Sequence, residues 1–176
     1  MNAVTVNAVM DIIEEDHRLV LKKTQALKDA VDCLLLPGDQ GLREALHRLQ
    51  RLNLYFASHF AFHTEEEERV LFPFLERNGS GGVETVAGLK RQHAEIQRKR
   101  EELGNCLSVA DDLEGGPPRM VIADLVGYGL ELWDLLDAHA REESRAVHEC
   151  VRAALMPGKP SLSGAGMPLP VVGCKN

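Results

Sequence analysis

The chain has 176 residues, of which 44% are hydrophobic, 27% charged and 5% aromatic, a composition typical of one globular domain that can bury a core. Its formal net charge of −7 argues against non-specific nucleic-acid binding, which needs a cationic surface. No apolar run approaches the roughly 18 residues of a membrane span, and the first ten residues do not resemble a secretion signal. We therefore expect a cytoplasmic protein that binds neither membranes nor nucleic acids. The four cysteines form no CxxC pair, which excludes a zinc ribbon and indicates reduced thiols at Cys33, Cys106, Cys150 and Cys174.

Helix-breaking residues divide the chain into four long segments. They lie at 37–38, 78–82, 114–118 and 157–160, and strand-like alternation is absent between them. Long helices joined by short connections predict an all-α, antiparallel up-down-up-down four-helix bundle over residues 1–156. Residues 157–176 are rich in proline and glycine and have no period, so we expect an irregular C-terminal tail.

The first two segments carry apolar seams with helical spacing, and each seam contains polar residues. The first seam runs from Val6 to Leu34 and includes His17. The second begins at Leu42 and ends at Phe74. Its predicted inward positions are Leu42, Leu49, Leu52, Phe56, His59, His63, Glu67, Val70 and Phe74.

The third and fourth segments repeat this arrangement. The seam of the third runs from Val86 to Leu107, contains His93 and is interrupted by Arg100. The seam of the fourth runs from Val121 to Cys150 and contains His139 and Glu143. Two glycines, Gly127 and Gly129, also lie in this segment. Each costs about 1 kcal/mol relative to alanine, and close approach to another helix is one explanation for them.

Six of these polar residues obey a single offset. His17 precedes His63 by 46 residues, as His93 precedes His139, and a glutamate follows each second histidine four positions later. Residues four apart lie on the same face of a helix. The repeat therefore predicts two equivalent helical hairpins that close around one shared site.

The inward position of these groups predicts a metal centre. Burying two carboxylates and four imidazoles without partners would cost several kcal/mol per charged group. Imidazole with carboxylate suits iron, manganese or zinc, whereas calcium prefers oxygen ligands alone. Two metals that share both glutamates would each have two histidines and about two free positions in an octahedral shell. A bridged iron pair fits this inventory better than zinc, which prefers closed tetrahedral sites.

The same residues allow simpler interpretations. Each HxxxE pair is also compatible with a surface ion pair on a metal-free bundle, and the glutamates beside Glu67 suit a solvated helix face. His47 and His148 fall outside the cluster and are interpreted as surface residues. His59 lies one turn before His63 and one turn after Tyr55, while its offset partner is Leu135. It is either an additional metal ligand, a hydrogen-bonding neighbour of the site, or a histidine satisfied by water or backbone.

The stretch from His63 to Pro73, HTEEEERVLFP, resembles the HxxxEE…LFP signature of hemerythrin-like (HHE cation-binding) domains. Asp16-His17-Arg18, Gln92-His93 and the final HxxxE at 139–143 resemble the other motifs, and the resemblance covers about residues 7–152. It implies a four-helix bundle with two non-haem iron ions bridged by an oxo or hydroxo group. By this resemblance the terminal ligands are His17, His63, His93 and His139, and the bridging ligands are Glu67 and Glu143.

The resemblance departs from the oxygen-carrying hemerythrins at two places. Those proteins have a second histidine one turn along the third helix, where this chain has Gln97 or Leu89, and their last ligand pair is a histidine with a more distant aspartate. Fewer histidines imply a more open centre. We expect a di-iron protein that binds or reacts with oxygen, nitric oxide or hydrogen peroxide. The alternatives are an iron- or redox-sensing interaction module and a non-catalytic iron-binding protein. The sequence assigns no catalytic residue and no protein partner.

Overall fold

The computed structural model describes residues 3–36, 39–113 and 116–155. Within these ranges the regular structure is entirely helical, as expected, and no strand occurs. No described helix is both long enough and apolar enough to cross a membrane. The expected tail at 157–176 lies outside the described residues.

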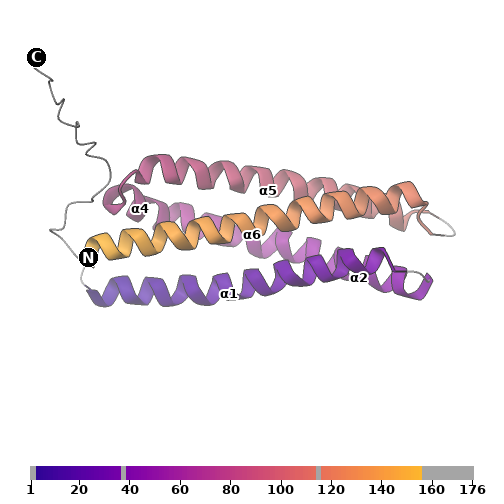
Figure 1. Cartoon of the computed structure of the whole chain (residues 1–176), viewed down its shortest axis with the longest axis horizontal. Helices are drawn as coiled ribbons and strands as arrows, with labels where there is room; N and C mark the ends of the chain where they lie inside the picture. The colour runs from indigo at the N-terminus through magenta and orange to yellow at the C-terminus, as the bar shows by residue number, and fades with distance from the viewer. Residues whose placement is uncertain (1–2, 37–38, 114–115, 156–176) are drawn as a thin grey trace, which may run out of the picture.

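Four helical rods lie side by side (Figure 1). The first is α1, Ala3–Leu34, and the last two are α5, Gly82–Asp111, and α6, Arg119–Leu155. The second rod consists of five consecutive pieces: α2 (Asp39–Tyr55), η1 (Phe56–Phe60), α3 (Ala61–Glu66), η2 (Glu67–Leu71) and α4 (Phe72–Asn78). α6 packs against α1, α4 and α5, while α2 packs against α1 and α5.

The second rod contains two π-helical turns, η1 and η2, without losing its direction. Tyr55, Ala61 and Phe72, which flank these turns, all keep right-handed helical torsion angles. The backbone N–H of Phe72 donates to the carbonyl of Glu67, five residues back instead of four. Pro73 follows immediately; because proline has no N–H and its ring crowds the preceding turn, a widened turn is favoured here. At η1 the Ser58 hydroxyl donates to backbone carbonyls one turn back, including that of Leu54 at 3.1 Å.

These π turns change which residues face the core. The predicted seam placed His59 and Val70 inward, but both are exposed, and the buried residues are Phe60 and Leu71. The prediction was wrong at these positions because it assumed α-helical spacing throughout, whereas a π turn takes up an additional residue. His63, between the two turns, and Glu67, the first residue of η2, keep their predicted inward positions.

Among the residues whose side chains are described, the buried apolar residues form two separate clusters. The larger one occupies one part of the bundle and includes Leu27, Leu49, Phe56, Phe60, Ile96, Leu103, Leu132 and Leu136. The smaller one consists of Leu71, Phe72, Leu75, Val86, Leu89, Ala146, Val147 and Cys150. Along α5 the smaller cluster ends at Leu89 and the larger begins at Ile96, and His93 lies between them. The polar residues predicted from the sequence therefore form a layer between two apolar regions.

Gly129 explains how closely α6 approaches α1. It is buried, and a Cβ atom added there would lie 2.4 Å from Cγ2 of Val31. Gly127 is exposed and has open space around it. Close helix approach therefore accounts for one of the two glycines.

Candidate metal centre

All six polar residues of the sequence repeat converge in the layer between the two apolar clusters. They are buried and come from every rod: His17 from α1, His63 and Glu67 from the second rod, His93 from α5, and His139 and Glu143 from α6. Their donor atoms form two groups, and within each group these atoms lie within 4.8 Å of one another. The first group contains His17, His63, Glu67 and Glu143, and the second contains Glu67, His93 and His139.

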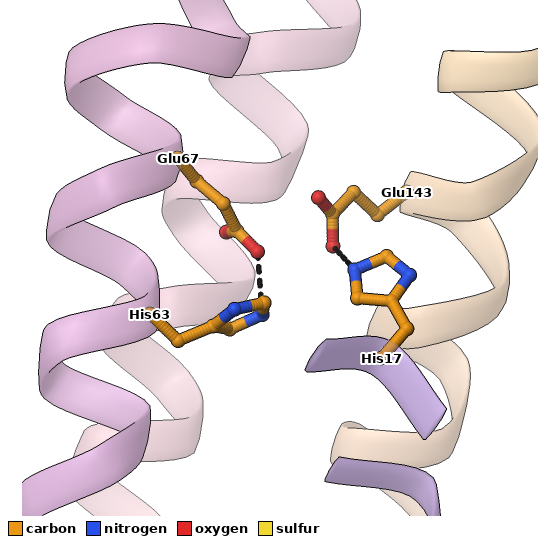
Figure 2. Close-up of side chains that lie close together, drawn as sticks. All are labelled: His17, His63, Glu67 and Glu143. Carbon is orange, nitrogen blue, oxygen red and sulfur yellow. Dashed lines mark hydrogen bonds and ion pairs between the residues drawn. The ribbon is translucent and has the colours of Figure 1, made fainter. Parts of the chain in front are cut away.

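The first group holds two carboxylates opposite each other (Figure 2). Nε2 of His17 donates a hydrogen bond of 2.7 Å to Oε2 of Glu143. Nε2 of His63 lies 2.5 Å from Oε1 of Glu67. Figure 2 shows both carboxylates and both rings pointing into the space between the second rod and α6.

Glu67 connects the first group to the second. Its Oε1 atom contacts His63, whereas its Oε2 atom lies 3.0 Å from Nε2 of His93. Glu143 also reaches across, since its Oε2 atom lies 3.8 Å from Nε2 of His139. Each carboxylate therefore lies between one histidine of the first hairpin and one of the second.

The geometry leaves acceptors unsatisfied. Within the described part of the chain, both oxygens of Glu67 and Oε1 of Glu143 are buried without a hydrogen-bond partner. The Nε2 atoms of His63 and His93 are close to the Glu67 oxygens, but they do not lie in the direction that a hydrogen bond requires. Leaving a buried carboxylate oxygen unpaired costs about 1–3 kcal/mol or more, and a cation between the donor atoms would offset that cost.

The second group also has the spacing of metal ligands. Nε2 of His93 and Nε2 of His139 are 3.3 Å apart. Two nitrogen ligands at about 2.1 Å from one ion and at right angles lie about 3 Å apart. The residues present therefore fit a metal ion in each group, with Glu67 shared.

Comparison with known families agrees with this geometry. Residues 8–151 match the family described as the hemerythrin HHE cation binding domain. The chain belongs to this family. No curated protein and no solved structure is similar enough to add to the assignment.

Burial and contact between these groups set the protonation of the HHE centre. Burial lowers the pKa of His139 to about 3, and the neighbouring histidines add to this effect. Burial alone would raise the pKa of Glu67, but the contacts with His63 and His93 outweigh it and hold that pKa well below its usual range. His139 is therefore neutral and Glu67 anionic at neutral pH, which are the forms that bind metal.

The pKa values of His17 and Glu143, the other ion pair of the centre, both lie above their usual values. Burial raises the pKa of Glu143, although the hydrogen bond from His17 opposes the change. Burial disfavours the charged form of His17, yet Glu143 raises its pKa above the usual value. Binding of a cation between them would displace protons from this pair.

Two aromatic rings pack against histidines of the HHE centre. Phe60 lies with its ring centroid 5.9 Å from that of His93 and 6.1 Å from that of His139. Phe72 stacks on His93 at 5.5 Å. Phe60 was not predicted to face the centre, because the π turn η1 brings it inward and no residue in the sequence indicates that turn.

The remaining sequence candidates belong to neither donor group. His59 is exposed and belongs to neither donor group; its ring stacks on Tyr55 at 4.6 Å. His47 and His148 are on the surface, as predicted. In the third helix Leu89 is buried in the smaller apolar cluster, while Gln97 is exposed and donates to Glu101.

Proposed function

We propose that this HHE domain holds two iron ions and binds or reacts with oxygen, nitric oxide or hydrogen peroxide there. The observation that carries the proposal is the position of Glu67, whose two buried oxygens lie within 3.0 Å of Nε2 atoms of His63 and His93. In this proposal His17 and His63 hold one iron, His93 and His139 hold the other, and Glu67 and Glu143 bridge them.

Iron is favoured by the chemistry of the donors. Four imidazoles and two carboxylates are suited to iron, manganese or zinc, and the described site offers no thiolate. Six donors shared by two ions leave each ion short of an octahedral shell, which suits a metal that binds an additional small ligand. A structural zinc ion would instead be expected in a closed tetrahedral shell.

The second group is the more open one. Glu143 approaches it less closely than it approaches the first group, since its Oε2 atom lies 2.7 Å from Nε2 of His17 but 3.8 Å from Nε2 of His139. At one turn on either side of His93 the chain has Leu89 and Gln97. When bound, an iron pair supplies redox chemistry and coordination positions for a small ligand. Phe60 and Phe72 pack against the ring of His93, which is buried, and this enclosure favours a diatomic molecule or peroxide over larger substrates.

We further propose that the helices run up-down-up-down, as expected from their short connections. The bundle then spans residues 1–156 and the tail residues 157–176. We also propose that the protein acts in the cytoplasm. Two alternative functions would use the same centre: an iron- or redox-sensing interaction module, and non-catalytic iron binding.

Metal analysis with an optical spectrum tests the proposal on protein purified from iron-supplied cells. We expect about two irons per chain and near-ultraviolet absorption from the oxidised pair. Oxygen, nitric oxide and hydrogen peroxide are then added in turn. A reversible spectral change indicates binding and sustained peroxide consumption indicates an enzyme. If neither occurs, a partner that binds in only one redox state indicates a sensor. One tightly held zinc and no iron would overturn the di-iron proposal.

A further inference from the structure

Behind the metal-facing side of His139 lies a chain of two hydrogen bonds that leads towards the surface. Nδ1 of His139 lies 3.0 Å from Oε1 of Gln92, a residue of α5. The amide nitrogen of Gln92 donates a 2.6 Å hydrogen bond to Oε2 of Glu142 on α6. Gln92 and Glu142 are both half-buried, and neither belongs to the donor groups of the centre.

The direction of these bonds follows from what each group can do. An ionised carboxylate only accepts hydrogen bonds, so Glu142 must face the NH2 end of the Gln92 amide. The carbonyl end of the amide is thereby turned towards His139. A carbonyl also only accepts, so Nδ1 of His139 must carry the proton and donate it. Neutral histidine has one N–H, and its Nε2 atom is then left with a free lone pair that points into the centre.

We propose that Glu142, acting through Gln92, selects the tautomer of His139 that can bind metal through Nε2. Gln92 and Glu142 are positioning residues, since neither donor atom reaches the centre itself. The inference rests on the metal centre of the proposed function, but tautomer selection is a property of the protein chain and is measurable without iron.

The other histidines of the centre provide an internal comparison. Nδ1 of His17 lies 3.2 Å from the hydroxyl of Ser144, which can donate or accept and therefore selects no tautomer. Nδ1 of His93 lies 3.5 Å from Glu68, a longer contact to a side chain that is 46% exposed. Of these three histidines, His139 has the shortest such contact and a partner whose own orientation is determined.

This arrangement matters most at the second group. Nε2 of His139 lies 3.3 Å from Nε2 of His93, and only bare nitrogen atoms can bind a shared ion there. If Nε2 of His139 carried the proton, the proton would occupy the place of the metal. Groups that orient ligand histidines in this way typically contribute 10- to 100-fold, as an order of magnitude, to metal affinity.

Reversing the charge at position 142 tests the inference directly. Lysine only donates hydrogen bonds, so Glu142→Lys should turn the Gln92 amide around and present its NH2 end to His139. Nδ1 of His139 must then accept, and its proton moves to Nε2. Asp134→Lys is the matched control, because Asp134 is an exposed acidic residue of α6 that takes no part in the Gln92 contacts.

The tautomer is read from nitrogen-15 NMR of the histidine rings in the full-length chain after removal of metal. We expect the Nδ1–H form of His139 in the parent and in Asp134→Lys, and the Nε2–H form in Glu142→Lys. Gln92→Leu, which removes the whole connection, should lose the preference for the Nδ1–H form. Circular dichroism melting checks that each variant is folded.

Affinity for Zn²⁺, measured by competition with a coloured chelator, provides the second measurement. It should fall about 10- to 100-fold in Glu142→Lys and Gln92→Leu, and by no more than a few-fold in Asp134→Lys. An unchanged His139 tautomer in both Glu142→Lys and Gln92→Leu would overturn the inference. A parent protein that takes up no iron but shows the expected tautomers would instead contradict the proposed function and leave this inference standing.

Discussion

Glu65 and Glu67 are two residues apart on the second rod and lie in opposite environments. Glu67 is 4% exposed and contacts two histidines, while Glu65 lies on the surface. The two residues have the same side chain, so a difference between their substitutions reports on position alone. This pair provides a residue-scale test of the centre.

Glu67→Ala should reduce the bound iron from about two per chain to below one, because it removes a ligand shared by both groups. Glu65→Ala should leave the iron content unchanged. Elemental analysis of both proteins, purified identically from iron-supplied cells, makes the comparison. Equal loss of iron in the two variants would show that the assignment of inward and outward faces is wrong.

His59 and His63 form a second matched pair at the residue scale. Because His59 is exposed and stacks on Tyr55, we expect His59→Leu to retain the iron and the near-ultraviolet spectrum of the parent. His63→Leu should lose iron, because it removes a donor of the first group. A changed spectrum or peroxide reaction rate in His59→Leu would instead assign His59 a role at the centre.

Much of the centre was predictable at this scale because its residues are polar and recur at fixed offsets. The inward positions of His17, His93 and His139 follow from α-helical spacing, which their helices keep. Gln92 and Phe60 were not predictable. A glutamine beside a ligand is common on any helix surface, and Phe60 would face elsewhere if η1 were an ordinary α turn.

At the scale of the helices, the contact of α1 with α6 depends on the absence of a side chain at one position. Val31 is fully buried and its methyl group occupies the space where a Cβ of residue 129 would lie. Valine is stiff about χ1, so this methyl group cannot easily turn away. The helices must separate if residue 129 becomes larger.

Gly129→Ala should therefore lower the free energy of unfolding by about 1–3 kcal/mol, the typical cost of overpacking a core. Gly127→Ala, two residues away in open space, should raise it by up to about 1 kcal/mol through helix propensity. Urea denaturation of both variants measures the difference. A stabilised Gly129→Ala protein would show that α1 and α6 do not pack closely.

The helix count and boundaries were largely predictable from the breakers and the seams, whereas the π turns were not. Periodicity assigns an average spacing and cannot register one additional residue in a turn. Pro73 is the one local signal, since it favours a widened turn before it, and η2 ends two residues earlier at Leu71. No proline follows η1 in the same way.

At the scale of the whole molecule, the buried charges make stability depend on pH. In the unfolded chain His139 titrates near its usual pKa of about 6.5, whereas in the folded protein its pKa is about 3. Between these values the unfolded state binds more protons, so the metal-free protein loses stability as the pH falls. Glu67, with its lowered pKa, adds to this loss below about pH 4.5, and the raised pKa of Glu143 opposes it.

His139→Gln isolates the contribution of this histidine. Between about pH 6 and pH 4, the free energy of unfolding of the metal-free parent should fall more steeply with acidification than that of the variant, by close to one proton. Urea denaturation of the two proteins at a series of pH values measures the slopes. Parallel slopes would show that His139 is as accessible to protons in the folded protein as in the unfolded chain.

The polar layer also determines how strongly the two apolar clusters of the bundle are coupled to each other. It separates the larger apolar cluster from the smaller one, and among the residues whose side chains are described the two clusters share no member. Without metal, we expect the helix segments of the smaller cluster, near Leu75 and Leu89, to unfold locally while the larger cluster stays folded. Their backbone amides should then show hydrogen exchange with solvent first. Ions bound by side chains from all four rods would couple the two clusters, so that neither unfolds alone. Metal would then convert two loosely coupled halves into one cooperative unit.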